Sequence, residues 1–195
     1  VDDTLAPPVA AGEVVGGGSS LLQAQAICPA WAFYQYRLGA KALNEPVEGF
    51  NPADRGTLVH ATLEAFWTEV TSSNALRSLN SDERAAAISR AAIAGIAQFE
   101  KSSHQTLSSR IREIEAKRLE RILGLWLEIE AKRTVPFTVV TREERRVIRV
   151  ADIAVNVVID RIDELADGRR IVLDYKTGAS IDIKNWASQR ITQPQ

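Results

Sequence analysis

Apolar residues in the first two thirds of the chain recur at the three- and four-residue spacings that are typical of α-helices. The pattern predicts helices at about residues 19–38, 56–70, 80–99 and 109–131. Ser19 or Ser20 suits the N-terminal cap of the first helix, and Gly39 suits its C-terminal stop. Residues 1–18 contain two consecutive prolines and three consecutive glycines without helical or strand periodicity, so we expect a flexible linker there.

The periodicity in the last of these helices is carried by Ile111, Ile114, Ile122, Leu125 and Ile129. After Pro136 the apolar residues alternate with polar ones and β-branched residues become frequent, which predicts strands. The expected strands span about residues 137–140, 145–150, 154–165 and 170–175. Helices followed by a sheet that they must cover indicate an α/β or α+β architecture of two or three layers. We expect one domain over residues 19–195, truncated at its C-terminus, as a piece of a larger protein.

The composition is that of a globular protein, with 45% hydrophobic and 25% charged residues. The sequence contains no apolar run of the ~18–20 residues that a membrane helix needs and no signal-peptide pattern at its start, so we expect a cytoplasmic protein without membrane association. Cys28 is the only cysteine, which excludes an internal disulfide, and we expect it to be a small buried hydrophobe.

The net charge of -1 gives the whole chain no general attraction for nucleic acid, so DNA binding requires local basic clusters. Basic residues near the blocks described below are candidates for a phosphate-binding rim, although each one taken alone is expected to be an ordinary surface charge. These candidates are Arg37, Lys41, Arg55, Arg161, Arg169, Arg170, Lys184 and Arg190.

Two neighbouring predicted strands carry acidic residues among apolar ones. Asp160 lies in the first strand, and Asp174 and Lys176 lie in the second. Because side chains alternate along a strand, Asp174 and Lys176 point to one face. Burying a carboxylate and an ammonium beside a core is costly unless a bound cation or a tight ion pair compensates. The alternative is a solvated hairpin with a surface ion pair.

The length of the loop between these strands decides which acids face each other. A three-residue loop ending at Gly168 pairs Asp160 with Asp174, and a hard divalent cation such as Mg²⁺ relieves the repulsion between the two carboxylates. A two-residue loop instead brings Asp163 onto the face of Asp174. Both registers remain open from the sequence. A metal between two carboxylates, with a lysine beside it, suits phosphodiester hydrolysis.

The segment from Asp160 to Gly178, which ends in Asp-Tyr-Lys-Thr-Gly, resembles the core of the RecB-like branch of the PD-(D/E)XK nucleases. Residues 28–38 and 55–64 resemble the two helices that precede this core in the family. The similarity covers three separated blocks, in the same order, across most of residues 20–195. It implies a restriction-endonuclease-like α/β fold, with a central mixed sheet flanked by helices.

The resemblance also implies roles by position. Asp160 matches the first metal-binding aspartate of the family, Asp174 matches the second acid, and Lys176 matches the catalytic lysine. His60 matches a histidine that supplies a further metal ligand, whereas without the family a single histidine on an apolar helix is more often a packed core residue. Glu64, one helical turn beyond His60, either orients the site or is solvated.

Gln195, with Gln193 as the alternative, resembles a catalytic glutamine of the family. Some relatives bind an iron-sulfur cluster, but one thiol cannot hold one, so no cluster is expected in this fragment. The resemblance implies Mg²⁺- or Mn²⁺-dependent cleavage of DNA, as an exonuclease in repair or recombination, linked to a helicase. The rival hypotheses are a catalytically inactive DNA-binding or scaffolding domain of the same fold, and a hydrolase of another phosphoester.

Overall fold

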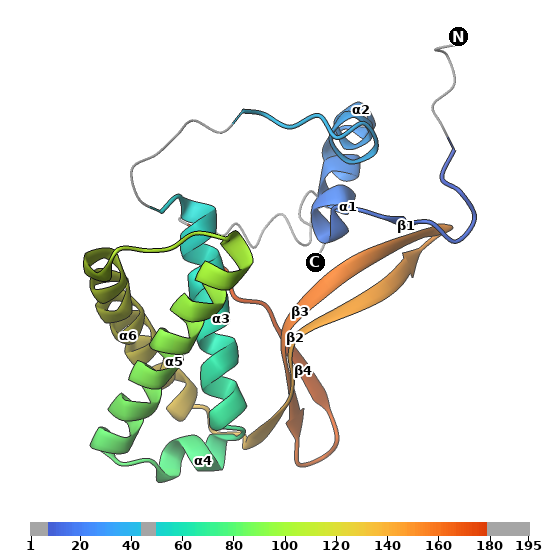
Figure 1. Cartoon of the computed structure of the whole chain (residues 1–195). Coiled ribbons are helices and arrows are strands. Elements are labelled where there is room, and N and C mark those ends of the chain that lie inside the picture. The colour runs from blue at the N-terminus through green and yellow to red at the C-terminus, as the bar shows by residue number, and fades with distance from the viewer. Residues whose placement is uncertain (1–7, 44–49, 179–195) are drawn as a thin grey trace. The chain divides into compact units, whose positions relative to one another are not determined.

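A computed structural model describes residues 8–43 and 50–178. The chain divides into two compact units, each built from segments that are far apart in the sequence (Figure 1). The first unit comprises Val1–Pro46, Arg145–Val158 and Ser180–Gln195, and the second comprises Val47–Glu144 and Ile159–Ala179. In the described ranges, no helix is long and apolar enough to cross a membrane.

In the first unit, strand β1 (Val14–Val15) precedes helix α1 (Gly18–Ile27), helix α2 (Pro29–Ala32) and a π-helical turn (Phe33–Arg37). The sequence predicted one helix to about Leu38. The helix is instead interrupted at Cys28, which is extended because the residue before a proline is restricted and Pro29 has no N–H to donate.

The start of α1 also differs from the expected serine cap. Gly17 caps the helix in the left-handed conformation, with φ of 104°, and a Cβ there would overlap the ring of Tyr36. Strand β1 lies within the predicted linker and pairs in parallel with β3 (Ile153–Leu165), Val15 opposite Val155. A strand of two residues is too short to show the alternation by which strands are recognised.

The second unit contains helices α3 (Pro52–Glu69), α4 (Ser73–Ser78), α5 (Ser81–Ser103) and α6 (Ser109–Ala131). Helices α3 and α5 begin with capping boxes at Asn51 and Asn80. Helices α3, α5 and α6 lie side by side (Figure 1). Their apolar side chains pack with Phe137 and Val139 of β2 and with Leu165 of β3, which places the main core between the helices and the sheet.

Helix α6 has the bounds that the sequence predicted, but it buries a different face. Its buried apolar residues are Leu119, Leu123 and Leu127. Most of the residues whose spacing predicted the helix are exposed: Ile111, Ile114, Leu125 and Ile129. The helix carries two apolar stripes, and periodicity alone does not decide which one meets the core.

The sheet contains β2 (Phe137–Val150), β3 and β4 (Arg170–Leu173), together with β1. It is mixed, because β3 pairs in parallel with β1 and antiparallel with β4. The two strands predicted at residues 137–140 and 145–150 form the single strand β2. The helices and the mixed sheet confirm the predicted α/β class.

The register between β3 and β4 follows the three-residue loop. Arg161 lies opposite Leu173, and the amide of Leu165 donates to the carbonyl of Arg169 across the turn. Gly168 closes the loop with φ of 81°, in the left-handed region that this loop type requires. The last pair of the two strands is Arg161 with Leu173, and counting on by one residue in each strand would bring Asp160 opposite Asp174.

Candidate metal centre

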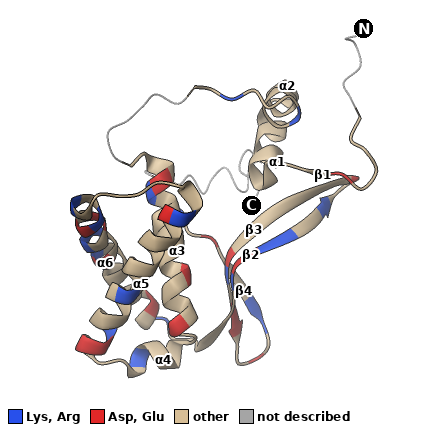
Figure 2. Ribbon diagram, in the orientation of Figure 1, with Lys and Arg blue, Asp and Glu red and all other residues tan. Residues whose placement is uncertain are grey.

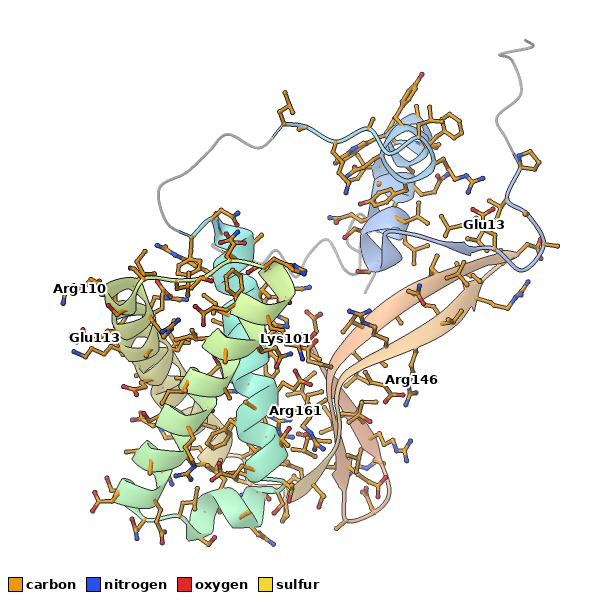
Figure 3. All side chains as sticks on the ribbon, viewed as in Figure 1. Glu13, Lys101, Arg110, Glu113, Arg146 and Arg161 are labelled. Carbon is orange, nitrogen blue, oxygen red and sulfur yellow. The ribbon has the colours of Figure 1, made fainter. Side chains whose placement is uncertain are left out.

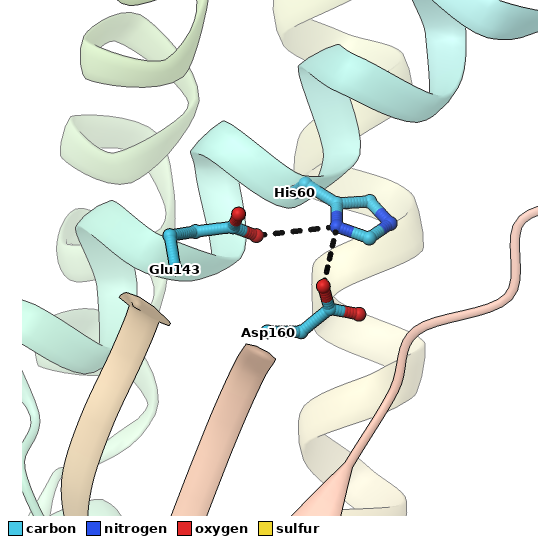
Figure 4. A group of neighbouring side chains, drawn as sticks. All are labelled: His60, Glu143 and Asp160. Atoms are coloured by element: carbon cyan, nitrogen blue, oxygen red, sulfur yellow. Dashed lines mark hydrogen bonds and ion pairs between the residues drawn. The ribbon is translucent and has the colours of Figure 1, made fainter. Parts of the chain in front are cut away.

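Three side chains that are far apart in the sequence converge in the second unit (Figure 4). His60 comes from α3, Glu143 from β2 and Asp160 from β3. Each offers one potential ligand atom, and these atoms all lie within 4.8 Å of one another. We call these three residues the candidate metal centre.

The ring of His60 is held through both of its nitrogens. Nε2 lies 3.0 Å from the carbonyl oxygen of Tyr175, and because a carbonyl only accepts, Nε2 carries the hydrogen and donates it. Nδ1 faces the acids, at 3.2 Å from Oε1 of Glu143 and 3.4 Å from Oδ1 of Asp160. This orientation makes Nδ1 the ring atom that is available as a ligand on the side of the two carboxylates.

Asp160 is almost fully buried, at 8% exposure. Its Oδ2 accepts a hydrogen bond of 2.6 Å from the amide of Tyr175, beyond the end of β4 at Leu173. The Asp160 carboxylate thus accepts from a backbone amide at the point where hydrogen bonding between β3 and β4 has ended. Its other oxygen, Oδ1, is the one that faces His60.

Glu143 was not predicted as a site residue. Its φ of 42° is unusual for a residue with a Cβ, and within a strand such a residue redirects the side chains, as at β-bulges. The alternating burial of β2 gives way at Thr141 to four consecutive half-buried residues. The available signal in the sequence was the charged run that separated the two predicted strands, because it contains two adjacent glutamates.

The electrostatics of the candidate metal centre favour a cation. The carboxylate of Asp160, and then that of Glu143, raise the pKa of His60 to about 10 against the lowering effect of burial. In the metal-free protein at neutral pH, a protonated imidazole therefore lies between two carboxylates. Two carboxylate oxygens and one imidazole nitrogen also form a donor set that divalent metals accept.

Asp174 and Lys176 pair with each other rather than with the candidate metal centre. Nζ of Lys176 lies 2.9 Å from Oδ2 of Asp174, and both side chains are partly exposed, at 37% and 44%. Among the described residues, the group that gathers potential ligand atoms contains Glu143 and not Asp174. Asp163, the acid favoured by the two-residue loop, is fully buried and pairs with Arg161.

Other expected site residues lie elsewhere. Glu64 accepts a hydrogen bond from Gln98 on the neighbouring helix α5. Gln195 and Gln193 lie outside the described residues. Cys28 is exposed, so the expectation that it is a buried hydrophobe is wrong; the break before Pro29 places it between two helices rather than on a packed helical face.

Of the six candidates for the basic rim that the structure describes, four pair with acidic residues, among them Arg37 with Glu13. Arg161 is fully buried, so it cannot contact a phosphate. Arg169 pairs with Asp167, and Arg170 pairs with Glu164. Figure 2 shows basic and acidic residues interspersed along α6 rather than gathered on it. Lys184 and Arg190 lie outside the described residues.

Comparison with known proteins assigns the chain to a family. No curated protein matches it. The family model of the PD-(D/E)XK nuclease superfamily matches residues 19–192, which include His60, Glu143, Asp160, Asp174 and Lys176. The helices and the mixed four-stranded sheet agree with the restriction-endonuclease-like fold expected from the resemblance. The chain therefore belongs to the PD-(D/E)XK nuclease superfamily.

Proposed function

We propose that this chain is a metal-dependent deoxyribonuclease whose candidate metal centre binds Mg²⁺ or Mn²⁺. The observation that carries the proposal is the convergence of His60, Glu143 and Asp160 within 4.8 Å, in a chain of a nuclease superfamily. Such a cluster is costly to assemble without a cation, because the two carboxylates repel each other. In the metal-free protein the His60 proton reduces this repulsion, and a bound metal takes its place.

The ligand atoms fit Mg²⁺ or Mn²⁺ better than a soft metal. Two of the three are carboxylate oxygens, which hard cations prefer, and the described residues of the centre include no thiolate. When bound, the ion polarises a phosphate oxygen and lowers the pKa of a coordinated water. The protein's part is to fix Nδ1 of His60 and Oδ1 of Asp160, each of which is held by a second contact to the backbone of Tyr175.

Asp174 and Lys176 complete the proposed site. The β3–β4 register supports Asp174 as a further ligand, since Asp174 follows Leu173 directly and Leu173 pairs with Arg161, the neighbour of Asp160. In this role the Asp174 side chain turns away from Lys176, which frees the ammonium to position the nucleophile or to stabilise negative charge on the phosphate. Gln195 is proposed as a further catalytic residue on the family resemblance alone.

The finer features of the function also follow from the resemblance. We propose membership of the RecB-like branch, exonuclease action on DNA in repair or recombination, and association with a helicase. Digestion of linear single-stranded, linear double-stranded and circular DNA distinguishes exonuclease from endonuclease action. An exonuclease degrades the linear forms and leaves the circular form intact, whereas an endonuclease cuts all substrates that it binds.

The test of the activity compares the wild-type protein with Lys176→Ala and Lys117→Ala, with Mg²⁺, with Mn²⁺ and with EDTA. Lys117 is the matched control, since its Nζ also pairs with a carboxylate at 2.9 Å, that of Glu113, but on helix α6. We expect metal-dependent cleavage that Lys176→Ala reduces by about 10²–10³-fold, as for loss of one donor to a developing negative charge. Lys117→Ala keeps the wild-type rate. Cleavage by Lys176→Ala at that rate contradicts the assigned role.

A catalytically inactive DNA-binding or scaffolding domain is the second candidate. The ion pair that occupies Lys176 and Asp174 favours it, because both groups are engaged with each other. This candidate predicts DNA binding without cleavage in any divalent metal. A gel-shift measurement beside the digestion assay distinguishes the two functions.

A further inference from the structure

A buried ionic network lies beside the candidate metal centre in the second unit. Its four charged members are Arg161, Asp163, Glu130 and Arg133. Two positive and two negative groups give the network no formal net charge. Arg161, Asp163 and Glu130 are at most 2% exposed, which is rare for charged residues.

Arg161 uses its guanidinium nitrogens in hydrogen bonds to Asp163 and Glu130 of this network and to Tyr175 outside it. Nε and Nη2 donate to the two carboxylate oxygens of Asp163, at 2.6 and 2.7 Å. Nη2 and Nη1 also donate to Glu130, and Nη1 donates to the hydroxyl of Tyr175 at 3.0 Å. The contact with Tyr175 is the one bond of Arg161 that leaves the set of charged groups.

Aromatic rings fix the plane of the guanidinium. Its central carbon lies 4.0 Å from the ring centroid of Trp67 on α3 and 4.9 Å from that of Phe137 on β2. Figure 3 labels Arg161 where the strands face α3. Because its hydrogen bonds and the two aromatic rings hold it, the Arg161 guanidinium has little freedom to move. It is therefore a rigid attachment point for the hydroxyl of Tyr175.

Tyr175 connects this network to the candidate metal centre. Its amide donates to Asp160 and its carbonyl accepts from His60. Its ring contacts those of His60 and Trp126 edge to face, with centroids 6.0 and 5.8 Å apart. It also lies between Asp174 and Lys176 in the sequence, on a segment that has left the β4 ladder. The hydroxyl contact with Arg161 therefore fixes a segment that strand pairing no longer holds.

We propose that Arg161 is a positioning residue that holds the candidate metal centre in place through the hydroxyl of Tyr175. The inference rests on the proposed metal-binding function. A buried ionic network is weak evidence for a contribution to stability, since well-packed apolar residues often serve as well. This network is connected to the candidate ligands through Tyr175, so it can fix their positions. Residues that hydrogen-bond to metal ligands are known to orient those ligands.

The test compares Tyr175→Phe with Arg133→Met. The first removes only the hydroxyl and keeps the backbone that contacts Asp160 and His60. The second damages the same network at Arg133, which pairs with Glu130 and Asp163 and makes no hydrogen bond to the tyrosine within the described part of the chain. Two properties are measured. The first is the Kd for Mn²⁺, by calorimetry, and the second is the signal of the amide proton of residue 175 in the metal-free protein, by its chemical shift and hydrogen exchange.

We expect Tyr175→Phe to weaken Mn²⁺ binding by about 10–100-fold, the usual effect of losing an outer partner of a metal ligand. The amide of residue 175 loses its downfield shift and exchanges faster, because its short bond to Asp160 loosens. Arg133→Met lowers the melting temperature and leaves both quantities unchanged.

The proposal is overturned if Tyr175→Phe keeps the wild-type Kd and amide signal, or if Arg133→Met alters both quantities as strongly as Tyr175→Phe. Failure of the proposed function looks different, because the wild-type protein itself then binds no Mn²⁺. In that case the amide signal of the metal-free proteins still decides whether Arg161 positions Asp160.

Discussion

The two ring nitrogens of His60 have different surroundings. Nε2 donates to the carbonyl of Tyr175, and Nδ1 faces two carboxylates. Histidines that bind metals commonly donate their second N–H to a backbone carbonyl or carboxylate, which fixes the tautomer. The ring therefore already has the orientation that the proposed metal binding requires, and the raised pKa of His60 places a proton on Nδ1 in the metal-free protein.

This proton makes the stability of the metal-free protein depend on pH. The pKa of His60 is raised from 6.5 to about 10 on folding, first by Asp160 and then by Glu143. A raised pKa stabilises the folded state fully below the unfolded value of 6.5, and this contribution is lost as pH rises through about 10. Urea unfolding in EDTA should show that the stability difference between wild type and His60→Gln shrinks over this interval. A constant difference contradicts the charged imidazole.

Glu143 is the candidate ligand that the structure adds to those proposed from the sequence, and replacing it with its isosteric amide tests this role. Glu143→Gln should weaken Mn²⁺ binding by at least about tenfold, the effect that loss of even an outer partner of a metal ligand produces. Glu64→Gln is the control, because Glu64 lies on the same helix as His60 but bonds to Gln98. Calorimetric titration measures both variants. If Glu143→Gln and the wild type bind Mn²⁺ with equal affinity, Glu143 is not a ligand of the candidate metal centre.

The sequence predicted some site residues and missed others for physical reasons. His60 was proposed from the family resemblance, and Asp160 was proposed from its place in a strand beside Asp174 and from the same resemblance. The two side chains do lie together. Glu143 was missed because the direction of its side chain depends on its own left-handed backbone conformation within a strand. Arg161 was considered a surface cation, and only the tertiary structure shows the acids and rings that bury it.

At the scale of elements, α3 and α5 approach each other closely at Gly95 and Thr62. A Cβ added to Gly95 would lie 2.8 Å from the backbone nitrogen of Thr62 and 2.4 Å from its Oγ1. Thr62 lies two residues from His60 on α3 and is itself buried. The absence of a side chain at Gly95 thus sets how closely α5 approaches the helix that carries His60.

Gly95→Ala should destabilise the protein by roughly 1–3 kcal/mol, the usual cost of overpacking. Gly124→Ala is the matched control on α6, where an added Cβ meets nothing within 4 Å. There alanine should stabilise the helix by about 0.5–1 kcal/mol relative to glycine. Chemical unfolding measures both changes. A neutral or stabilising Gly95→Ala contradicts the close approach of the two helices.

The elements themselves were predicted unevenly. Long periodic helices such as α6 were placed within their bounds, and the loop ending at Gly168 allowed the register that the structure adopts. The break before Pro29 and the short helix α4 were missed, since a local restriction and a six-residue element barely alter the periodicity. Which face of α6 is buried depends on the neighbouring elements, and its sequence alone does not specify it.

At the scale of the whole molecule, all described residues of the proposed site belong to the second unit. Two of the boundaries between the units fall within β2 and β3, so no change of composition marks these two in the sequence. The expectation of a single domain over residues 19–195 stays a prediction. The superfamily match also spans segments of both units.

The most direct test of the account is anomalous diffraction from crystals of the full chain soaked in Mn²⁺. We predict one strong peak at about 2.0–2.6 Å from Nδ1 of His60 and from carboxylate oxygens of Glu143 and Asp160, the range of divalent ions on such ligands. A peak at other residues, or none at a concentration that supports DNA cleavage, would contradict the claim that these three side chains hold the catalytic metal.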